Sequence, residues 1–266
     1  MIAKDGRKSR YEINAAKIDY KGRPADLVVF HDISERKKME EKLRIVGGLT
    51  RHDVRNKLAV ITGSIYLTKK KLAGIPDVLE NLDDMQLACD QIEAIFKFAR
   101  DYERLGMEEL AFVDVGMMVD RAAGSFQDLR GATVVNKCHG LSVLADSFLV
   151  RLFYNLIDNS LKHGEKLTQI RIRQEESEDG LRLIYEDDGV GLSKDVKSRI
   201  FTEGFTTGKG SGYGLYLIKR MMEVYGWRIH ENGEPDKGAR FVMTIPKTRS
   251  NWKQNYKRAD GYPKTD

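Results

Sequence analysis

His52 is followed directly by Asp53 and, one helical turn on, by Asn56. Because an α-helix turns about 100° per residue, His52 points about 200° away from Thr50 and Val54, which belong to an apolar stripe, and therefore faces solvent. A neighbouring carboxylate can hold one imidazole nitrogen protonated and leave a lone pair on the other. The sequence therefore offers a candidate nucleophile, with an ordinary solvated histidine as the alternative.

A second group of polar side chains lies on one face of a predicted helix. Asn155, Asn159 and Lys162 follow at i, i+4 and i+7. Amide oxygens can bind Mg²⁺, and a lysine can meet a phosphate as a point charge. The opposite face is apolar and consists of Leu152, Phe153, Leu156, Ile157 and Leu161. Taken alone, this is also the pattern of any amphipathic helix.

Asp187 ends a predicted strand and is followed by Gly189 and Gly191. Its carboxylate can accept a hydrogen bond from an exocyclic amine, and the glycines let backbone approach a flat ring. A simple strand-ending turn is the alternative interpretation.

Gly210, Gly212 and Gly214 run into the start of a predicted helix. Backbone N–H groups and the helix dipole there favour an anion, so the segment is predicted to be a flexible lid. It matches neither the P-loop nor the dinucleotide fingerprint.

The elements that must position these residues fall into two regions. Two apolar stripes with steps of three and four, separated by a turn at 74–77, predict a long antiparallel helical hairpin. Each helix carries a narrow apolar face that the other helix cannot fully cover, so we expect dimerisation into a four-helix bundle. The stripes are Leu43, Val46, Thr50, Val54, Leu58, Ile61, Ile65, Thr68, Leu72 and then Leu79, Leu82, Met85, Cys89, Ile92, Phe96, Ala99, Tyr102.

The region after Gly106 is predicted to be an α/β sandwich with an antiparallel or mixed sheet. Helices are expected at 114–124, 146–163 and 213–225, a β-hairpin at 132–144, strands at 168–175, 181–187, 227–232 and 239–245, and a loop at 189–212. Before the helical hairpin, residues 11–19 and 25–30 are expected to be strands, and Ser34 is expected to cap the first helix.

Composition sets further limits. Among 266 residues there are 45 Lys and Arg, 40 Asp and Glu, and a net charge of +5, without the basic stripe and interleaved aromatics of a nucleic-acid surface. Cys89 and Cys138 are expected to be buried, reduced thiols, as in a reducing compartment. No apolar run is long enough to span a bilayer, so we expect a cytoplasmic location, with any membrane anchor of the parent protein lying outside this chain.

Taken in order, these motifs resemble the H, N, G1, F and G2 boxes of the sensor histidine kinase family, over about residues 34–246. The resemblance implies an α+β multidomain protein: a long antiparallel helical hairpin forming a dimeric four-helix bundle, followed by an α/β sandwich of the Bergerat type, shared with gyrase-type ATPases. It implies four regions: residues 1–36, similar to the end of a PAS sensor domain; 37–106, a linker helix and phosphotransfer hairpin; 107–247, an ATP-binding catalytic domain; and 248–266, a basic, disordered tail.

The resemblance also implies roles. His52 would be the phosphoacceptor, Asp53 its base and Asn56 the residue that orients water during dephosphorylation of a partner. Mg²⁺ would be bound by Asn155 and Asn159. The full ATP site would consist of Asn155, Asn159, Lys162, His163, Asp187, Gly189, Gly191, Thr206, Thr207, Gly210, Gly212, Gly214 and Leu215.

The implied function is ATP-dependent autophosphorylation of His52 and transfer of the phosphoryl group to a response-regulator aspartate. The implied partners are a receiver domain, a second copy of the chain and an upstream sensor segment. Two departures from the family pattern stand out: Lys57 replaces a frequent proline five residues after the histidine, and His163 replaces a frequent aromatic residue. The alternatives are a dimeric ATP-binding scaffold without phosphotransfer, a Bergerat-fold serine kinase or ATPase, and a kinase whose main output is dephosphorylation.

Overall fold

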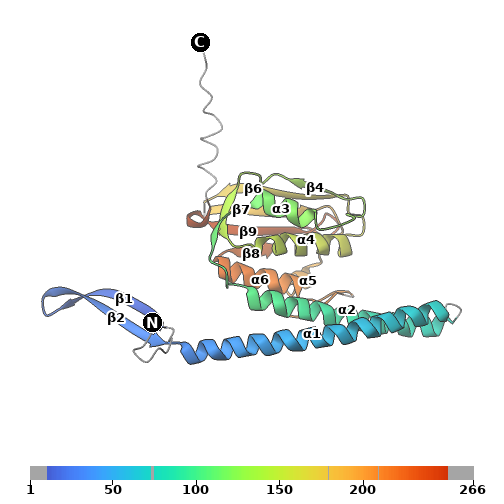
Figure 1. The fold of residues 1–266 in the computed structure, drawn as a ribbon. Helices are drawn as coiled ribbons and strands as arrows, with labels where there is room; N and C mark the ends of the chain where they lie inside the picture. The colour runs from blue at the N-terminus through green and yellow to red at the C-terminus, as the bar shows by residue number, and fades with distance from the viewer. Residues whose placement is uncertain (1–10, 73–74, 179, 209, 251–266) are drawn as a thin grey trace, which may run out of the picture. The chain divides into compact units, whose positions relative to one another are not determined.

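A computed structural model describes residues 11–72, 75–178, 180–208 and 210–250, without side chains for 38–46 and 49. The chain divides into two compact units, with the boundary between Cys89 and Asp90 inside a helix (Figure 1). The two units are described separately below.

The first unit begins with a two-stranded antiparallel sheet. Strand β1 (Tyr11–Tyr20) pairs along its whole length with β2 (Arg23–Asp32), from Tyr11 opposite Asp32 to Tyr20 opposite Arg23. Both turn residues, Lys21 and Gly22, have positive φ angles of 54° and 75°, as a tight two-residue hairpin turn requires. The predicted strands are confirmed. Their side chains are almost all exposed, because a two-stranded sheet cannot bury a core alone.

Two long helices follow the hairpin, as predicted. Helix α1 runs over Ser34–Lys71 and passes Lys57 without a break, and α2 runs over Pro76–Arg104. Proline suits the first helical position of α2, because the N–H that it lacks has no partner there anyway. The prediction that Ser34 caps α1 is wrong: the serine lies inside the helix, and its N–H donates to the carboxylate of Asp32 at 2.8 Å.

The apolar stripes are only partly covered within one chain. Leu58, Ile65, Leu82 and Cys89 are buried. Other stripe positions remain open to solvent, with exposed fractions of 41% at Ile61, 51% at Met85 and 38% at Ile92. The predicted stripe positions Leu43 and Val46 are among the residues whose side chains are not described.

The second unit contains two sheets (Figure 1). Strands β3 (Ala111–Asp114) and β5 (Ser142–Ala145) form a small antiparallel pair. The main sheet has the order β4-β6-β7-β9-β8, in which only β4 and β6 are parallel. Its strands are β4 (Thr133–Asn136), β6 (Gln169–Ser177), β7 (Gly180–Asp187), β8 (Arg228–Glu231) and β9 (Arg240–Pro246).

The predicted β-hairpin at 132–144 is wrong, because its two strands belong to different sheets. The connection between them contains a turn, in which the N–H of Leu141 donates to the carbonyl of Cys138 at 3.1 Å, but this turn does not pair the two strands. The side chain of Asn136 donates to the carbonyl of Gly116 at 2.9 Å, and the N–H of Gly140 donates to the carboxylate of Asp114 at 3.0 Å. The connection therefore runs from β4 in the main sheet to β5, which pairs with β3.

One hydrophobic core joins three helices to a single face of the main sheet. These are α3 (Val115–Ala123), α4 (Leu149–His163) and α6 (Gly214–Tyr225). Alternate strand residues such as Leu183, Tyr185 and Met243 enter this core, so their neighbours project from the other face. The predicted loop at 189–212 includes a single helical turn, α5 (Lys194–Lys197). The predicted disordered tail, 248–266, is wrong at its start, because Lys247–Arg249 form a 3-10 turn and Ser250 forms a β-bridge with Val143. Residues 251–266 lie outside the described residues.

Candidate functional site

A cavity of about 530 Å³ opens on the second unit. Its walls come from α4, from the end of β7, from the glycine-rich segment before α6 and from the last turns of α2. The lining includes Asn155, Asn159, Lys162, His163, Asp187, Gly191, Thr206, Thr207, Gly210, Gly212, Gly214 and Leu215. Of the predicted ATP-site residues, only Gly189 is not part of it.

Helix α4 supplies the polar wall of the cavity. Its apolar face is buried in the core, which turns Asn155 and Asn159 toward the opening. Lys162, one turn further on, is about half exposed and forms an ion pair with Asp158 at 2.7 Å. His163 lies at the rim, where its ring approaches Gly208. This wall carries amide oxygens and one mobile cation, which suits a phosphate chain with its metal ion.

Asp187 is held in place by three donors. The hydroxyl of Ser160 donates to Oδ2 at 2.5 Å, and the N–H groups of Gly189 and Ala239 donate to Oδ1 at 3.1 and 2.9 Å. Ser160 also shares a 2.8 Å hydrogen bond with the hydroxyl of Tyr185, whose pKa is raised well above its usual value because the ring is fully buried. The carboxylate is therefore fixed in orientation before any ligand arrives.

Ser160 was not predicted as a site residue, although its position on the apolar side of α4 was a signal. The serine lies on the apolar side of α4, and only 5% of it is exposed. A polar group at such a position must find a buried partner. The sequence therefore predicts that Ser160 has a buried partner, although it does not identify Asp187 as that partner.

Two glycines near Asp187 allow close backbone approaches. At Gly191, where φ is +67°, an added Cβ would lie 2.8 Å from the carbonyl oxygen of Gly238. At Gly189 it would lie 2.6 Å from the Cα of Gly164. Gly189 therefore packs the end of β7 against the end of α4 and does not line the cavity, so its predicted role at the ATP site stays a prediction.

The glycine-rich segment reaches α6 opposite α4. Gly212 has a φ of +75°, and an added Cβ at Gly214 would meet the amide of Asn155 at 3.7 Å. The hydroxyl of Thr206 donates to the carbonyl of Gly208 and accepts from its N–H, both at 3.2 Å. The first N–H groups of α6 thus lie near the polar wall, where an anion is favoured.

The last turns of α2 also contribute, which the sequence prediction missed because it assigned α2 only to the apolar stripe. Phe98 stacks on Tyr213 with ring centroids 4.6 Å apart. Lys97 lines the cavity and lies over the ring of Tyr154 at 4.7 Å. Burial, aided by the charge of Arg151, lowers the pKa of Lys97.

The candidate nucleophile lies in the first unit. The side chain of His52 is 74% exposed, as predicted. Its Nδ1 lies 3.6 Å from a carboxylate oxygen of Asp53 and 3.4 Å from the amide nitrogen of Asn56. Both neighbours approach Nδ1, whereas Nε2 forms no hydrogen bond or ion pair with the residues that the structure describes.

No group of three or more His, Cys, Asp and Glu side chains suited to a metal occurs among the described residues. The donors that face the cavity are the amides of Asn155 and Asn159. Mg²⁺ commonly keeps several waters and takes most other ligands from a substrate's phosphates, so two amides fit a metal that arrives with a nucleotide. Cys89 and Cys138 are free and buried, as predicted.

Comparisons with known proteins agree with this site. Residues 145–249 match the family of histidine kinase-, DNA gyrase B- and HSP90-like ATPases. Over 245 residues the chain is 28% identical to sporulation kinase A of Bacillus subtilis, covering 85% of this chain and 40% of that protein. It is 25% identical to the signal transduction histidine-protein kinase AtoS of Escherichia coli over 83% of this chain and 39% of AtoS. The chain is related to sensor histidine kinases.

Two solved structures resemble the fold of this chain. Full-length ShkA in complex with AMPPNP matches 75% of this chain and 45% of its own, with a TM-score of 0.53 and 21% identity. The histidine kinase AdeS of Acinetobacter baumannii matches 74% of this chain and 98% of its own, with a TM-score of 0.51 and 15% identity. The predicted fold, a helical region followed by a histidine kinase-type ATPase domain, is confirmed. No helix in the described ranges is long and apolar enough to cross a membrane.

Proposed function

We propose that this chain is a protein-histidine kinase that transfers the γ-phosphoryl group of ATP to His52. The observation that carries the proposal is the cavity in which the fixed carboxylate of Asp187 and the amide wall of α4 face the glycine-rich segment before α6. Most of the lining lies within the matched residues 145–249, and the remainder comes from the last turns of α2. The chain spans about 40% of the first curated relative, so the activity of a longer protein is part of this proposal.

The nucleotide would lie with its adenine amine on Asp187. The carboxylate already accepts three protein hydrogen bonds, and its fixed position suits recognition of a single exocyclic donor. The triphosphate would run toward Asn155 and Asn159, with Lys162 free to leave Asp158 and meet a phosphate oxygen. A bound Mg²⁺ would neutralise phosphate charge, held by the two amide oxygens.

His52 would attack through Nε2. Its lone pair forms the bond to the γ-phosphorus while the bond from that phosphorus to the bridging oxygen breaks and ADP leaves. The proton on Nδ1 would be shared with Asp53, the carboxylate 3.6 Å away. The phosphorylated histidine is exposed and would donate its phosphoryl group to an aspartate of a response-regulator receiver domain. Positioning and charge neutralisation would supply most of the rate.

The working unit would be a homodimer. One helical hairpin leaves Ile61, Met85 and Ile92 exposed on its stripes, and a second copy could bury them in a four-helix bundle. The exposed sheet β1–β2 would be the end of a PAS-like sensor segment coupled through α1. We propose residues 1–36, 37–106, 107–247 and 248–266 as the functional regions, and a cytoplasmic location.

The test is incubation of the purified chain with γ-labelled ATP and Mg²⁺, followed by acid and alkali treatment. An acid-labile, alkali-stable label that is absent from His52→Gln identifies phosphohistidine at His52. Asp187→Asn is a matched control, because it should lose nucleotide binding while leaving His52 intact. Label retained by His52→Gln would refute the assignment. ATP binding without any label would favour the scaffold.

A second activity, dephosphorylation of the partner, is supported by one contact. The amide of Asn56 lies 3.4 Å from the ring of His52 and can orient a water beside it. Asn56→Ala should then keep autophosphorylation and slow the loss of phosphate from a phosphorylated receiver domain. Equal loss of both activities would contradict a separate role for Asn56.

A further inference from the structure

The face of the main sheet opposite the helices carries a row of basic side chains. Arg182 on β7 lies opposite Thr244 on β9, and Thr244 lies opposite Arg228 on β8. In the next row, Val242 on β9 lies opposite His230 on β8. Because strands lie about 4.8 Å apart, Arg182 and Arg228 bracket Thr244 at a distance their long side chains can span.

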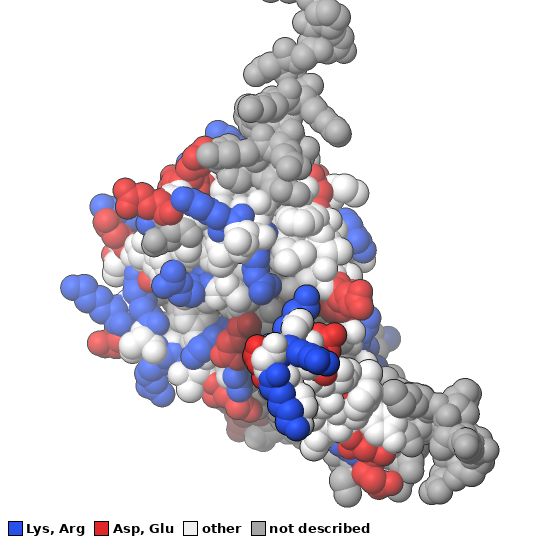
Figure 2. Space-filling view, turned by 90° about the vertical axis from the view of Figure 1, so that its left-hand side faces the viewer, with Lys and Arg blue, Asp and Glu red and all other residues white. Residues whose placement is uncertain are grey.

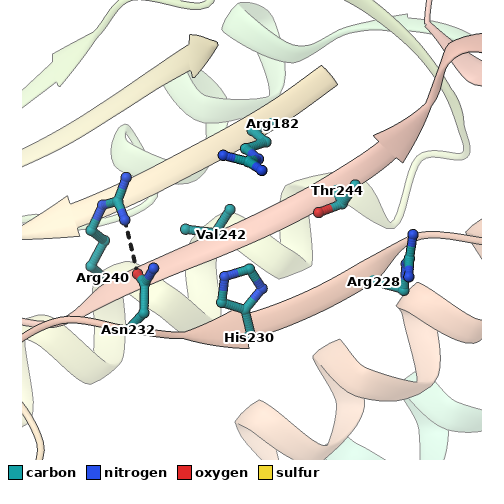
Figure 3. Close-up of a pocket in the computed structure, with 7 residues that line it drawn as sticks. All are labelled: Arg182, Arg228, His230, Asn232, Arg240, Val242 and Thr244. Atoms are coloured by element: carbon teal, nitrogen blue, oxygen red, sulfur yellow. Dashed lines mark hydrogen bonds between the residues drawn. The ribbon is translucent and has the colours of Figure 1, made fainter. Parts of the chain in front are cut away.

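These side chains line a shallow hollow of about 420 Å³ (Figure 3). Figure 3 shows them projecting from β7, β8 and β9 on the side away from the helices, which lie behind the strands. The lining is Arg182, Arg228, His230, Asn232, Arg240, Val242 and Thr244, with no acidic residue. The molecular face shown in Figure 2, by comparison, interleaves basic and acidic side chains.

Two of the three arginines lack an acidic partner. Arg240 is ion-paired with Glu186 at 2.7 Å and donates to Asn232 at 3.0 Å. For Arg182 and Arg228, both exposed, no acidic partner occurs among the described residues. A guanidinium is a planar donor that binds carboxylates in pairs of hydrogen bonds. Glu175 on β6 lies opposite Arg182 but forms an ion pair with Arg173. The hollow therefore has an excess of positive charge at one end.

The hollow continues along the sheet. A second hollow, of about 340 Å³, shares Asn232 and Arg240 with the first, but its lining also includes Glu186, Asp187, Asp188 and Glu234. The basic part of the groove therefore ends at Arg240. From Thr244 to Arg240 the strand rises about 13 Å, at about 3.3 Å per residue. The groove is therefore long enough for about four residues of an extended chain.

We propose that this groove, defined by the seven residues of the first hollow, binds an extended acidic segment of a partner protein. Charge complementarity carries the proposal: carboxylates would meet Arg182 and Arg228 over Thr244. Single-stranded nucleic acid fits less well, because no Phe, Tyr or Trp lines the groove as a platform for bases. The chain's own end fits less well too, since residues 251–266 contain Lys253, Lys257, Arg258 and Lys264 against two aspartates.

A purely structural role for the arginines is the competing explanation. Ile184 and Val242 belong to the same face but are buried, with 0% and 2% exposed. Arginine stems can cover apolar side chains while the charged heads stay in water. That role needs only the stems, whereas binding of an acidic segment needs the charges. Arg→Gln separates the two, because it keeps part of the stem and removes the charge.

The probe is a fluorescein-labelled glutamate peptide roughly four residues long, matched to the groove by the rise of an extended chain. Binding to the full chain is followed by anisotropy at about 0.15 M salt, where distant surface charges are largely screened. We expect saturable binding that weakens at least about tenfold in Arg182→Gln/Arg228→Gln and further in Arg182→Glu/Arg228→Glu. Unchanged thermal unfolding of the Gln variant shows that the fold is intact.

The matched control is Arg121→Glu/Lys219→Glu, which makes the same charge change at exposed positions of α3 and α6. The control should change the affinity by less than about twofold. Equal weakening in both variants, or no saturable binding of the peptide, overturns the proposal. Binding of oligouridylate through Arg182 and Arg228 in place of the glutamate peptide would also overturn it and assign the groove to nucleic acid.

Discussion

Lys197 and Glu231 form an ion pair in the second unit, and removing the lysine should destabilise that unit. The lysine ammonium lies 2.7 Å from Oε2 of Glu231 and also donates to the carbonyl of Gly233. Only 18% of the Lys197 side chain and 1% of the Glu231 side chain are exposed. Lys197 ends α5, next to Val196 in the cavity wall.

The expected loss of unfolding free energy in Lys197→Met follows from the contacts that Glu231 keeps. Oε1 of Glu231 keeps two hydrogen bonds, from the N–H groups of Gly233 at 2.9 Å and Arg240 at 3.1 Å. Oε2 loses its cation in a site without solvent. Breaking a buried pair by removing one partner costs about 3–5 kcal/mol. Because half of the carboxylate stays bonded, we expect about 3 kcal/mol of unfolding free energy to be lost.

Urea unfolding followed by tryptophan fluorescence measures this effect. Trp227 is 4% exposed and lies in the core of the second unit. A Trp252→Phe background leaves it as the sole tryptophan of the chain. The double variant Lys197→Met/Glu231→Gln should recover most of the loss, because the neutral amide removes the stranded charge. A loss below about 1 kcal/mol in Lys197→Met, or strictly additive losses in the double variant, would refute the reasoning.

Three further outcomes are expected. Ser160→Ala should weaken ADP binding about 5- to 30-fold in calorimetry, because it frees the carboxylate of Asp187 from a buried donor; unchanged affinity would contradict this. Gly191→Ala should lower the thermal unfolding midpoint and nucleotide affinity together, since Cβ would strike backbone oxygens at a positive φ. Although burial opposes it, hydrogen bonds from the side chain and N–H of Thr168 lower the pKa of Asp188, so its stabilisation should be complete above about pH 4 and lost as pH falls further; Asp188→Asn should flatten that acid limb in unfolding measurements.

The long, strongly periodic elements could be predicted from the sequence because their signals are local. The stripe of α4 and the paired strands β6 and β7 each follow one period over many residues. The prediction of a hairpin at 132–144 was wrong because the pairing of short strands depends on contacts that are distant in the sequence. Two short apolar runs look alike whether they pair with each other or with distant strands, and side-chain bonds of Asn136 and Asp114 decide between these outcomes.

The predicted site residues divide in the same way. Asn155, Asn159 and Asp187 could be found because their side chains alter an otherwise apolar pattern. Ser160 could not be tied to Asp187, 27 residues away, without knowing that α4 packs on β7. Lys97 and Phe98 were missed because a stripe on α2 predicts only that a face is apolar, not which element meets it.

Helix α2 belongs to both compact units of the chain. The division between the two units falls inside α2, after Cys89. Its first half carries stripe residues such as Leu82, whereas its last turns carry Phe98 against Tyr213, the residue directly before α6. Tyr213 follows the glycine-rich segment, so any movement that separates α2 from α6 must break a stacked aromatic pair, worth about 0.5–1.5 kcal/mol. Under the proposed function, that energy is small enough for nucleotide binding to overcome, and the Phe98–Tyr213 contact would restrain the ATPase domain until a nucleotide binds.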